Sequence, residues 1–390
     1  MIPKSLFDNT ETAFKLKSDS ELERAYFLFK MISKEPLVRI GAAATKFALN
    51  LNLPVEGLIR STVFDHFCGG VNEKDCMPVV DGLSNAGVFS VLDYSVEGKE
   101  EDAQFDFTTQ KVIELSIFAK EKTTMPFSVF KPTGLGRLEV WKKVTKKEAL
   151  TEPEEKEWHD ITKRYHRICK TASECNISLL IDAEEYCMQD AADDLCEQMM
   201  EKYNLKKAIV FNTLQCYRWD RLDYLKEQHA KAREKGYILG FKIVRGAYME
   251  KESERAEEQN YSSPICASKS ETDANFDEIM RYIFDNLNDI SLFLGTHNEA
   301  SSYLAMEIME EKGISKDDSR VWFGQLYGMS DHLTFNIASE GYNAAKYIPF
   351  GPVKDVMPYL IRRAEENTSV AGQTNRELTL LKKERTRRKL

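Results

Sequence analysis

Eight short runs of apolar and β-branched residues limit the fold of this chain more than any other feature. They lie at 88–92, 127–130, 177–181, 208–211, 239–244, 292–294, 321–323 and 344–348. Stretches with helical periodicity lie between them, at 158–172, 190–203, 222–235, 276–287 and 300–312. The charged stretch 142–156 is expected to extend the connection after the second run. Eight strands that alternate with helices favour an α/β fold with a closed (β/α)8 TIM-type barrel over an open sheet.

The residues before the first run have a different pattern. Leu22, Tyr26 and Phe29 share one helical face, and the periodicity breaks at Pro36 and resumes over 37–47. The sequence therefore predicts three segments. They are a helical N-terminal arm at 1–85, a barrel at 86–370 and a basic C-terminal tail at 371–390.

The charges of the chain are unevenly distributed. Its 54 Lys and Arg residues are outnumbered by 63 Asp and Glu residues, which gives a net charge of −9. Residues 376–390 hold seven basic and two acidic side chains, or +5, so the rest of the chain carries −14. This acidic body argues against a nucleic-acid partner, because nucleic-acid binders present a basic face.

Several protein classes are excluded by what the sequence lacks. No apolar run approaches the roughly 18–20 residues that span a bilayer, and the N-terminus resembles neither a secretory signal nor a transit peptide. The eight cysteines form no C-x-x-C pair, and the six histidines form no H-x-H or H-E-x-x-H motif. We therefore expect reduced thiols, no metal site and a location in the bacterial cytoplasm.

Polar side chains gather at the predicted strand ends, which is where barrel enzymes place their chemistry. The residues at or just beyond these ends include Asp93, Glu97, Lys131, Asp182, Gln215, Tyr217, Lys242, Arg245, Thr296, His297, Asn298, Gln325 and Tyr347. Any one of them has a structural explanation, since a lone Asp often caps a helix and a lone Lys is usually solvated. Polar groups at nearly every strand end instead indicate a functional site. Lys242 stands out, because a cation inside the apolar string FKIV needs a partner.

The segment after the eighth run, GPVKDVMPYLIRRAEEN, gives the strongest local signal. Asp355 suits a helix N-cap. One face of the resulting helix carries Tyr359, Arg362, Arg363 and Glu366. Two adjacent guanidiniums beside an aromatic ring suit a ligand that bears a carboxylate. The alternative is a solvated helix held by pairs such as Arg362 with Glu366.

The sequence contains no complete nucleotide-binding loop. The string KPTGLG has Gly134 and Gly136 but lacks the third glycine of G-x-G-x-x-G, and no P-loop occurs. A nucleotide cofactor would therefore bind at the barrel mouth and not on a Rossmann turn.

Six strings in the chain resemble those of the proline dehydrogenase family and occur in the family's order. They are IDAEE, LQCY, KIVRGAY, THN, FGQLYGM and YLIRRAEEN, within residues 88–367. The resemblance implies a distorted (β/α)8 barrel whose last helix lies over the barrel mouth. It also implies a monofunctional, FAD-dependent proline:quinone oxidoreductase, which transfers a hydride from L-proline to FAD and forms Δ1-pyrroline-5-carboxylate.

The same resemblance implies roles for residues that contact the substrate. Arg362 and Arg363 would bind the proline carboxylate with help from Lys131, and Asp182 would pair with these cations. The pyrrolidine ring would be surrounded by Tyr248, Leu326, Tyr347 and Tyr359. In the family, a tyrosine at the position of Tyr347 goes with proline as the substrate, whereas a smaller residue goes with hydroxyproline.

FAD would be held without a covalent bond. The residues that match its contacts in the family are Gln215, Lys242, Arg245, Gly246, Ala247, Thr296, His297, Asn298 and Glu366. Lys242 would lie beside the flavin N5, which explains a cation within a strand, and Lys269 would reach the FAD phosphates. Glu97 matches a family glutamate that pairs with the first arginine when the site closes.

The second half-reaction needs an electron acceptor, which in this family is membrane ubiquinone or menaquinone. Leu378, Leu380 and Leu381 precede the C-terminal basic cluster, a pattern that suits contact with the inner face of the cytoplasmic membrane. The alternative, which we favour, is a solvated and frayed C-terminus. A separate pyrroline-5-carboxylate dehydrogenase is the expected recipient of the product.

Three other functions stay open. One is a hydroxyproline dehydrogenase of the same family. Another is a Schiff-base lyase that uses Lys131 or Lys242, although this leaves the arginine pair and the THN run unexplained. The last is a non-catalytic barrel that binds an amino acid, which predicts a colourless protein.

Overall fold

The structure, a computed structural model, describes residues 2–34, 36, 38, 41, 43, 56–96, 100–369 and 371–390. In residues 58, 364–369 and 371–374 it describes the backbone alone. The helical periodicity expected over 37–47 falls largely outside the described residues, and so do Glu97 and the side chain of Glu366.

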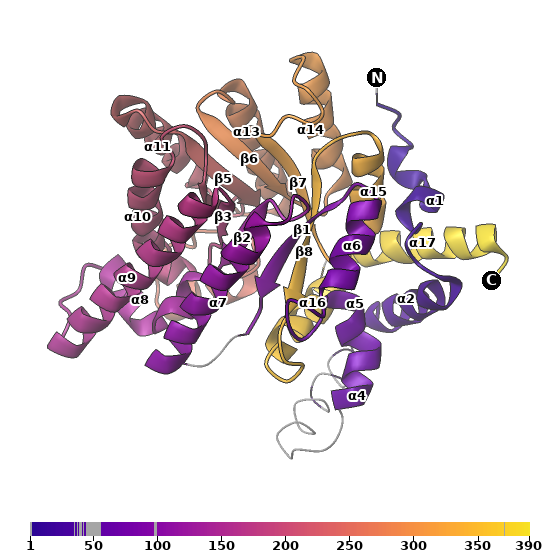
Figure 1. Ribbon diagram of the computed structural model, residues 1–390, viewed down its shortest axis with the longest axis horizontal. Coiled ribbons are helices and arrows are strands. Elements are labelled where there is room, and N and C mark those ends of the chain that lie inside the picture. The colour runs from indigo at the N-terminus through magenta and orange to yellow at the C-terminus, as the bar shows by residue number, and fades with distance from the viewer. Residues whose placement is uncertain are drawn as a thin grey trace. The chain divides into compact units, whose positions relative to one another are not determined.

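The described residues form eight parallel strands that close in chain order into a barrel (Figure 1). The strands are β1 (Phe89–Tyr94), β2 (Phe127–Phe130), β3 (Ser178–Ile181), β4 (Val210–Gln215), β5 (Leu239–Val244), β6 (Ile290–Gly295), β7 (Val321–Leu326) and β8 (Ala344–Phe350). Each of them overlaps one of the apolar runs, so the predicted α/β, TIM-type fold is confirmed.

One helix directly precedes β1, and helices follow the strands along the chain, as the alternating pattern predicts. They are α6 (Met77–Asn85), α7 (Asp102–Lys120), α8 (Leu138–Thr145), α9 (Glu152–Cys175), α10 (Tyr186–Tyr203), α11 (Arg221–Lys235), α12 (Met249–Glu258), α13 (Lys269–Asp285), α14 (Glu299–Glu311), α15 (Asp331–Ser339) and α16 (Met357–Ser369). The charged stretch 142–156 lies in the long connection between β2 and β3, as expected, and it contains the end of α8 and the start of α9. Thr151 and Glu154 form a capping box that begins α9.

The chain divides into two compact units. Unit 1 comprises Met1–Gly98, His297–Glu299 and Gly324–Leu390, and unit 2 comprises Lys99–Thr296 and Ala300–Phe323. Within unit 2, β2 to β6 pair in parallel, strand by strand. The ring of Phe127 on β2 meets those of Phe211, Phe293 and Trp322 edge-on, at centroid distances of 5.9, 5.1 and 5.0 Å. These bulky side chains from different strands fill the core of the unit.

Unit 1 contains the β1–β8 pair and the N-terminal arm. In the strand pair, Val91 lies opposite Tyr347. The described elements of the arm are η1 (Leu6–Asp8), α1 (Thr10–Ala13), α2 (Asp19–Ile32), α4 (Glu56–Ile59), the π-helical turn η2 (Arg60–Phe64) and α5 (Asp65–Phe67). A capping box of Ser18 and Glu21 begins α2, which buries Leu22 and Phe29 as its periodicity predicts.

The basic C-terminus is a helix, α17 (Ala371–Arg388), so the expectation of a frayed end is wrong. Figure 1 shows it running beside α1 and α2. Leu380 and Leu381 are buried in a cluster with Phe14, Leu22 and Phe29 of the arm. The leucines that suggested a membrane-facing segment therefore belong to the core of unit 1.

Ion pairs with the arm compensate much of the positive charge of α17. Arg376 pairs with Asp8 at 2.7 Å, Arg385 with Glu23 at 2.5 Å and Arg388 with Asp19 at 3.0 Å. The helix that follows β8 is thus not the last helix of the chain, and the +5 segment is a packed element.

Within the described part of the chain, no helix combines the length and the apolar composition that a membrane span requires.

Burial of the thiols differs from one cysteine to the next. Cys175, Cys187 and Cys266 are partly exposed, and the other cysteines are buried.

Candidate active site

Lys242, the cation inside β5, forms an ion pair with Asp182 of the IDAEE string. Asp182 directly follows β3, and Lys242 lies near the middle of β5, where it is buried. A buried ammonium requires such a partner, because desolvation otherwise disfavours its charge. The sequence indicated that both residues matter but did not pair them with each other.

Arg245, just after β5, joins several of the predicted cofactor contacts in unit 2. Its Nε donates to Asp273 at 2.7 Å and one terminal nitrogen donates to the Thr296 hydroxyl at 3.0 Å. Lys269 binds the other oxygen of Asp273 at 2.6 Å. Burial alone would raise the pKa of Asp273, but the hydrogen bonds from Lys269 and Arg245 lower it. Asp273, which the sequence reasoning missed, therefore holds two of the predicted cations together.

The chain turns sharply at Gly246, whose φ of +126° is open to glycine but rarely to other residues. A Cβ at this position would lie only 2.6 Å from ring atoms of Tyr217. Ala247 is exposed beside it, and the half-buried Tyr248 precedes α12 as its N-cap residue. Glycine at 246 thus allows the RGAY backbone to pack closely against the Tyr217 ring.

Glu184 organises the strand ends of unit 2 and was missed at the sequence level. Its carboxylate accepts hydrogen bonds from the backbone N–H of Thr133 at 2.8 Å and from the Thr133 hydroxyl at 2.7 Å. Its carbonyl oxygen accepts a hydrogen bond from the side chain of Gln215 at 2.9 Å. Glu184 therefore ties the turn that carries Lys131 to a predicted cofactor contact. The signal that could have found it is the second acidic residue of IDAEE.

On α16, in unit 1, the guanidinium of Arg363 lies 5.2 Å from the centroid of the Tyr359 ring. Both side chains are buried, whereas Arg362 is partly exposed. Tyr359 belongs to an apolar cluster against which Leu326 also packs. The predicted carboxylate-binding arginine is thus a partly desolvated cation on an aromatic face, a setting that strengthens its attraction for an anion.

Tyr347 on β8 is buried, and its backbone is hydrogen-bonded to the residue that follows β7. Its backbone carbonyl accepts a hydrogen bond from the N–H of Tyr327 at 2.7 Å. Leu326, the last residue of β7, directly precedes Tyr327. Leu326 and Tyr347, both expected to contact the substrate ring, are therefore neighbours in unit 1.

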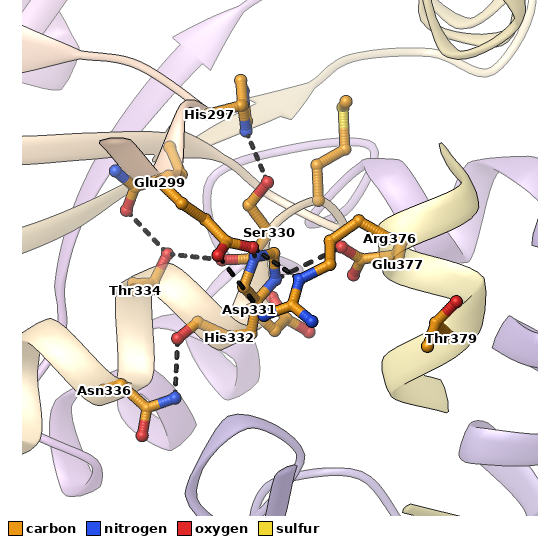
Figure 2. Close-up of polar contacts among 12 residues, drawn as sticks. His297, Glu299, Ser330, Asp331, His332, Thr334, Asn336, Arg376, Glu377 and Thr379 are labelled. Carbon is orange, nitrogen blue, oxygen red and sulfur yellow. Dashed lines mark hydrogen bonds and ion pairs between the residues drawn. The ribbon is translucent and has the colours of Figure 1, made fainter. Parts of the chain in front are cut away.

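His297 is held by Ser330, with 2.9 Å between its Nδ1 and the hydroxyl oxygen (Figure 2). Burial, followed by the positive charges of Lys346, Arg363 and His332, lowers the pKa of His297 to about 3. Its ring is therefore neutral at physiological pH and offers one donor and one acceptor nitrogen. Asn298 follows it in the chain.

The donor chemistry of these residues fits a flavin nucleotide. Arg245, Lys242 and Lys269 supply positive charge, Gln215 and Thr296 supply neutral polar groups, and Gly246 permits close approach of backbone. The predicted contacts fall in both units. Lys131 and Asp182 belong to unit 2, and Arg362 and Arg363 belong to unit 1. Among the described residues, no group of three His, Cys, Asp or Glu side chains is arranged to hold a metal ion.

Comparisons with known proteins agree with the motif reading. The model of the proline dehydrogenase family matches residues 76–376. The carbapenem antibiotics biosynthesis protein CarD of Pectobacterium carotovorum subsp. carotovorum is 34% identical over 333 residues, which cover 85% of this chain and 86% of CarD. Mitochondrial proline dehydrogenase 1 of Homo sapiens is 39% identical over 235 residues, which cover 60% of this chain and 39% of the human protein.

Solved structures give the same fold. Proline utilization A (PutA) from Bdellovibrio bacteriovorus matches with a TM-score of 0.70 and 19% identity, over 94% of this chain and 39% of that protein. The matched region is thus well under half of the human protein and of PutA, but most of CarD. On the family match over residues 76–376, the chain belongs to the proline dehydrogenase family and is an oxidoreductase.

Proposed function

We propose that this chain oxidises L-proline to Δ1-pyrroline-5-carboxylate with non-covalently bound FAD. The observation that carries the proposal is the buried guanidinium of Arg363 on the ring of Tyr359, beside Arg362. A rigid, partly desolvated fork of donors suits the carboxylate of a small amino acid. The family match supplies the reaction class.

The side chains of this chain would orient the substrate and set its charge state. Arg362, Arg363 and Lys131 would hold the carboxylate. Tyr248, Leu326, Tyr347 and Tyr359 would exclude water from the pyrrolidine ring. Exclusion of water disfavours the protonated ring amine, and the amine must be neutral before the hydride leaves C5. The chemistry that FAD supplies when bound is the acceptance of that hydride.

The cofactor contacts follow from the same proposal. The residues assigned to FAD are Gln215, Lys242, Arg245, Gly246, Ala247, Lys269, Thr296, His297, Asn298 and Glu366. Asp182 would keep Lys242 charged in its strand, and Asp273 would position Arg245 and Lys269. In this arrangement the carboxylates orient the cations that meet the cofactor.

The visible spectrum tests this function directly. We expect a yellow protein whose flavin absorbance bleaches when L-proline is added without oxygen, and does not bleach with D-proline. A chain that takes up no flavin after addition of FAD would contradict the proposal. It would support a non-catalytic amino-acid-binding barrel, whereas borohydride trapping of a carbonyl substrate on Lys131 or Lys242 would support a lyase.

Tyr347 should make the enzyme prefer proline to trans-4-hydroxyproline. We expect kcat/KM for proline to be higher by about tenfold or more, because a bulky wall leaves no room for the added hydroxyl. Steady-state kinetics with both substrates measure this ratio. Tyr347→Ser should reduce it, and Tyr347→Phe, which keeps the ring, should preserve it. Equal kcat/KM values in the wild type would support a hydroxyproline dehydrogenase instead.

A second candidate substrate follows from the similarity to CarD, which covers 86% of that protein. CarD is named as a carbapenem antibiotics biosynthesis protein. This similarity favours a substituted pyrrolidine carboxylate as the substrate, with the same arginine pair. Ranking kcat/KM for L-proline against ring-substituted prolines distinguishes the two candidates.

For the second half-reaction we propose ubiquinone or menaquinone as the acceptor, and a separate pyrroline-5-carboxylate dehydrogenase as the recipient of the product. Since Leu380 and Leu381 of α17 are buried and Leu378 packs against them, contact with a membrane surface would have to use other residues. Quinone-dependent turnover with soluble quinone analogues, compared with a dye acceptor, tests the first proposal.

A further inference from the structure

Ser330 and His332, at the start of α15, are both linked to the segment that carries His297. Ser330 has a left-handed backbone, with φ +51°, and its hydroxyl binds Nδ1 of His297 at 2.9 Å. His332, two residues on, binds Oε1 of Glu299 through Nε2 at 3.1 Å. Glu299 lies two residues after His297 and begins α14. The orientation of His297 is thus fixed both through its ring and through the chain that follows it.

The C-terminal helix α17 completes this arrangement. Oε2 of Glu377 lies 3.4 Å from Nδ1 of His332. The guanidinium of Arg376 binds Glu299 at 2.6 Å and Asp8 of the arm at 2.7 Å. Figure 2 shows Glu299 in contact with both His332 and Arg376. We call His332, Glu299, Arg376 and Glu377 the His332 cluster.

Charge compensation explains why this cluster is stable although it is buried. His332 is only 2% exposed, and the ring of Phe7 covers it edge-on at 6.5 Å. Burial alone would lower the pKa of His332, but its hydrogen bond to Glu299 and the negative charges of Glu299 and Glu377 raise it to about 9. His332 is therefore an imidazolium between two carboxylates at physiological pH.

The other charges near His332 are paired among themselves. Arg376 divides its guanidinium between Glu299 and Asp8. Asp331, adjacent in the chain, binds Lys17 at 3.0 Å and Lys346 at 2.9 Å. The two glutamates are thus the direct carboxylate partners of His332 that the described residues provide.

We propose that the His332 cluster positions His297 and Asn298 for the cofactor, so that α17 controls how tightly FAD is held. This inference rests on the proposed function, because the cofactor role of His297 does. Through Glu377 and Arg376, α17 fixes His332 and Glu299. His332 and Glu299 in turn hold the two segments that flank the site, which are the start of α15 with Ser330 and the start of α14 just after Asn298. The cluster residues are positioning residues, since they act on the cofactor site only through His297 and Asn298.

The decisive variant is Glu377→Gln in the full-length holoenzyme. Loss of one carboxylate lowers the pKa of His332, so that His332 loses its proton at moderately alkaline pH and its bond to Glu299 weakens. We expect the dissociation constant of FAD to rise about fivefold at pH 8.5, the effect of one weakened hydrogen bond, and to change less at pH 6. The increase of flavin fluorescence on dilution measures FAD release at both pH values.

Glu384→Gln is the matched control. Glu384 lies on the same helix, its side chain is fully buried, and it binds Arg387 and Arg388 at 2.8 and 2.7 Å. This variant weakens the packing of α17 without touching the His332 cluster, so its FAD affinity should stay within about twofold of wild type at both pH values. Arg376→Gln, at a side chain one-third exposed, is the milder variant if Glu377→Gln does not fold.

The outcomes separate the inference from the proposed function. Equal FAD affinity in wild type and Glu377→Gln at both pH values overturns the inference alone. An equal loss in Glu377→Gln and Glu384→Gln also overturns it, because α17 would then act only by stabilising the fold. A wild-type chain that takes up no FAD overturns the proposed function, and this inference with it.

Discussion

Replacing Arg363 with methionine is expected to lower kcat/KM for L-proline by about 30- to 5,000-fold. Methionine retains the apolar stem that packs near Tyr359 but removes the guanidinium. Loss of one partner from a desolvated charge pair costs about 2–5 kcal/mol, which gives this range. Steady-state kinetics with L-proline and a dye acceptor measure the change, most of which should appear as a higher KM.

Arg363→Lys distinguishes charge from geometry. Lysine keeps the positive charge but cannot offer two parallel N–H groups, so it should recover only part of the lost kcat/KM. Arg387→Met is the control, because Arg387 lies on α17, its side chain is 44% exposed, and its partners among the described residues are Glu384 and Glu11, neither of which is assigned to the site. If Arg363→Met leaves kcat/KM within twofold of wild type, Arg363 does not bind the substrate carboxylate.

The strand positions could be predicted from the sequence because each strand carries a buried apolar run. The runs at 127–130 and 239–244 coincide with β2 and β5. The run at 208–211 does not locate the end of β4, which continues to Gln215 through mostly polar residues that are all buried. These residues pair with β5, Gln215 opposite Val244. Partners on a neighbouring strand, and not the apolar character of β4 itself, decide where it ends.

The motifs found many candidate residues of the site but not the contacts between them. Asp182 and Lys242 were both identified, yet their ion pair joins residues 60 positions apart, which no local spacing reveals. Asp273 was missed because its contact with Arg245 joins residues 28 positions apart, although its pair with Lys269 has the local i,i+4 spacing of a helix. The C-terminal segment was predicted to be solvated because its positive charge was considered without the carboxylates of the N-terminal arm that pair with it. Leu380 and Leu381 gain burial only when α2 supplies the opposite face.

Replacing Asp331 with asparagine is expected to lower the free energy of unfolding by about 3–5 kcal/mol. This loss is larger than that expected for a polar substitution at the protein surface. Asp331 holds two ammonium groups, at 3.0 Å from Lys17 and 2.9 Å from Lys346, and the Lys346 side chain is completely buried. Burial lowers the pKa of Lys346, which shows how much its charge depends on this carboxylate. Denaturant unfolding of both proteins at pH 7 measures the loss.

The free energy of unfolding, measured as the pH is lowered, gives an independent check. The positive charges of Lys17 and Lys346 hold the pKa of Asp331 far below its ordinary value, although burial alone would raise it. A carboxyl whose pKa is lower in the folded state stabilises the protein above its unfolded pKa, about 3.9, and this stabilisation is lost as the pH falls through the folded value. The difference in unfolding free energy between wild type and Asp331→Asn should therefore shrink in strong acid.

Two further variants separate a buried charge from an ordinary ion pair. Asp285→Asn breaks an exposed pair with Lys312 and should cost less than about 1 kcal/mol. Combining Asp331→Asn with Lys346→Met removes a completely buried cation together with its partner, so the double variant should be more stable than Asp331→Asn alone. Equal losses from Asp331→Asn and Asp285→Asn would show that Asp331 stabilises no buried charge. The cation at Lys346 would then be held by its hydrogen bonds to the backbone carbonyls of Met329 and Leu326.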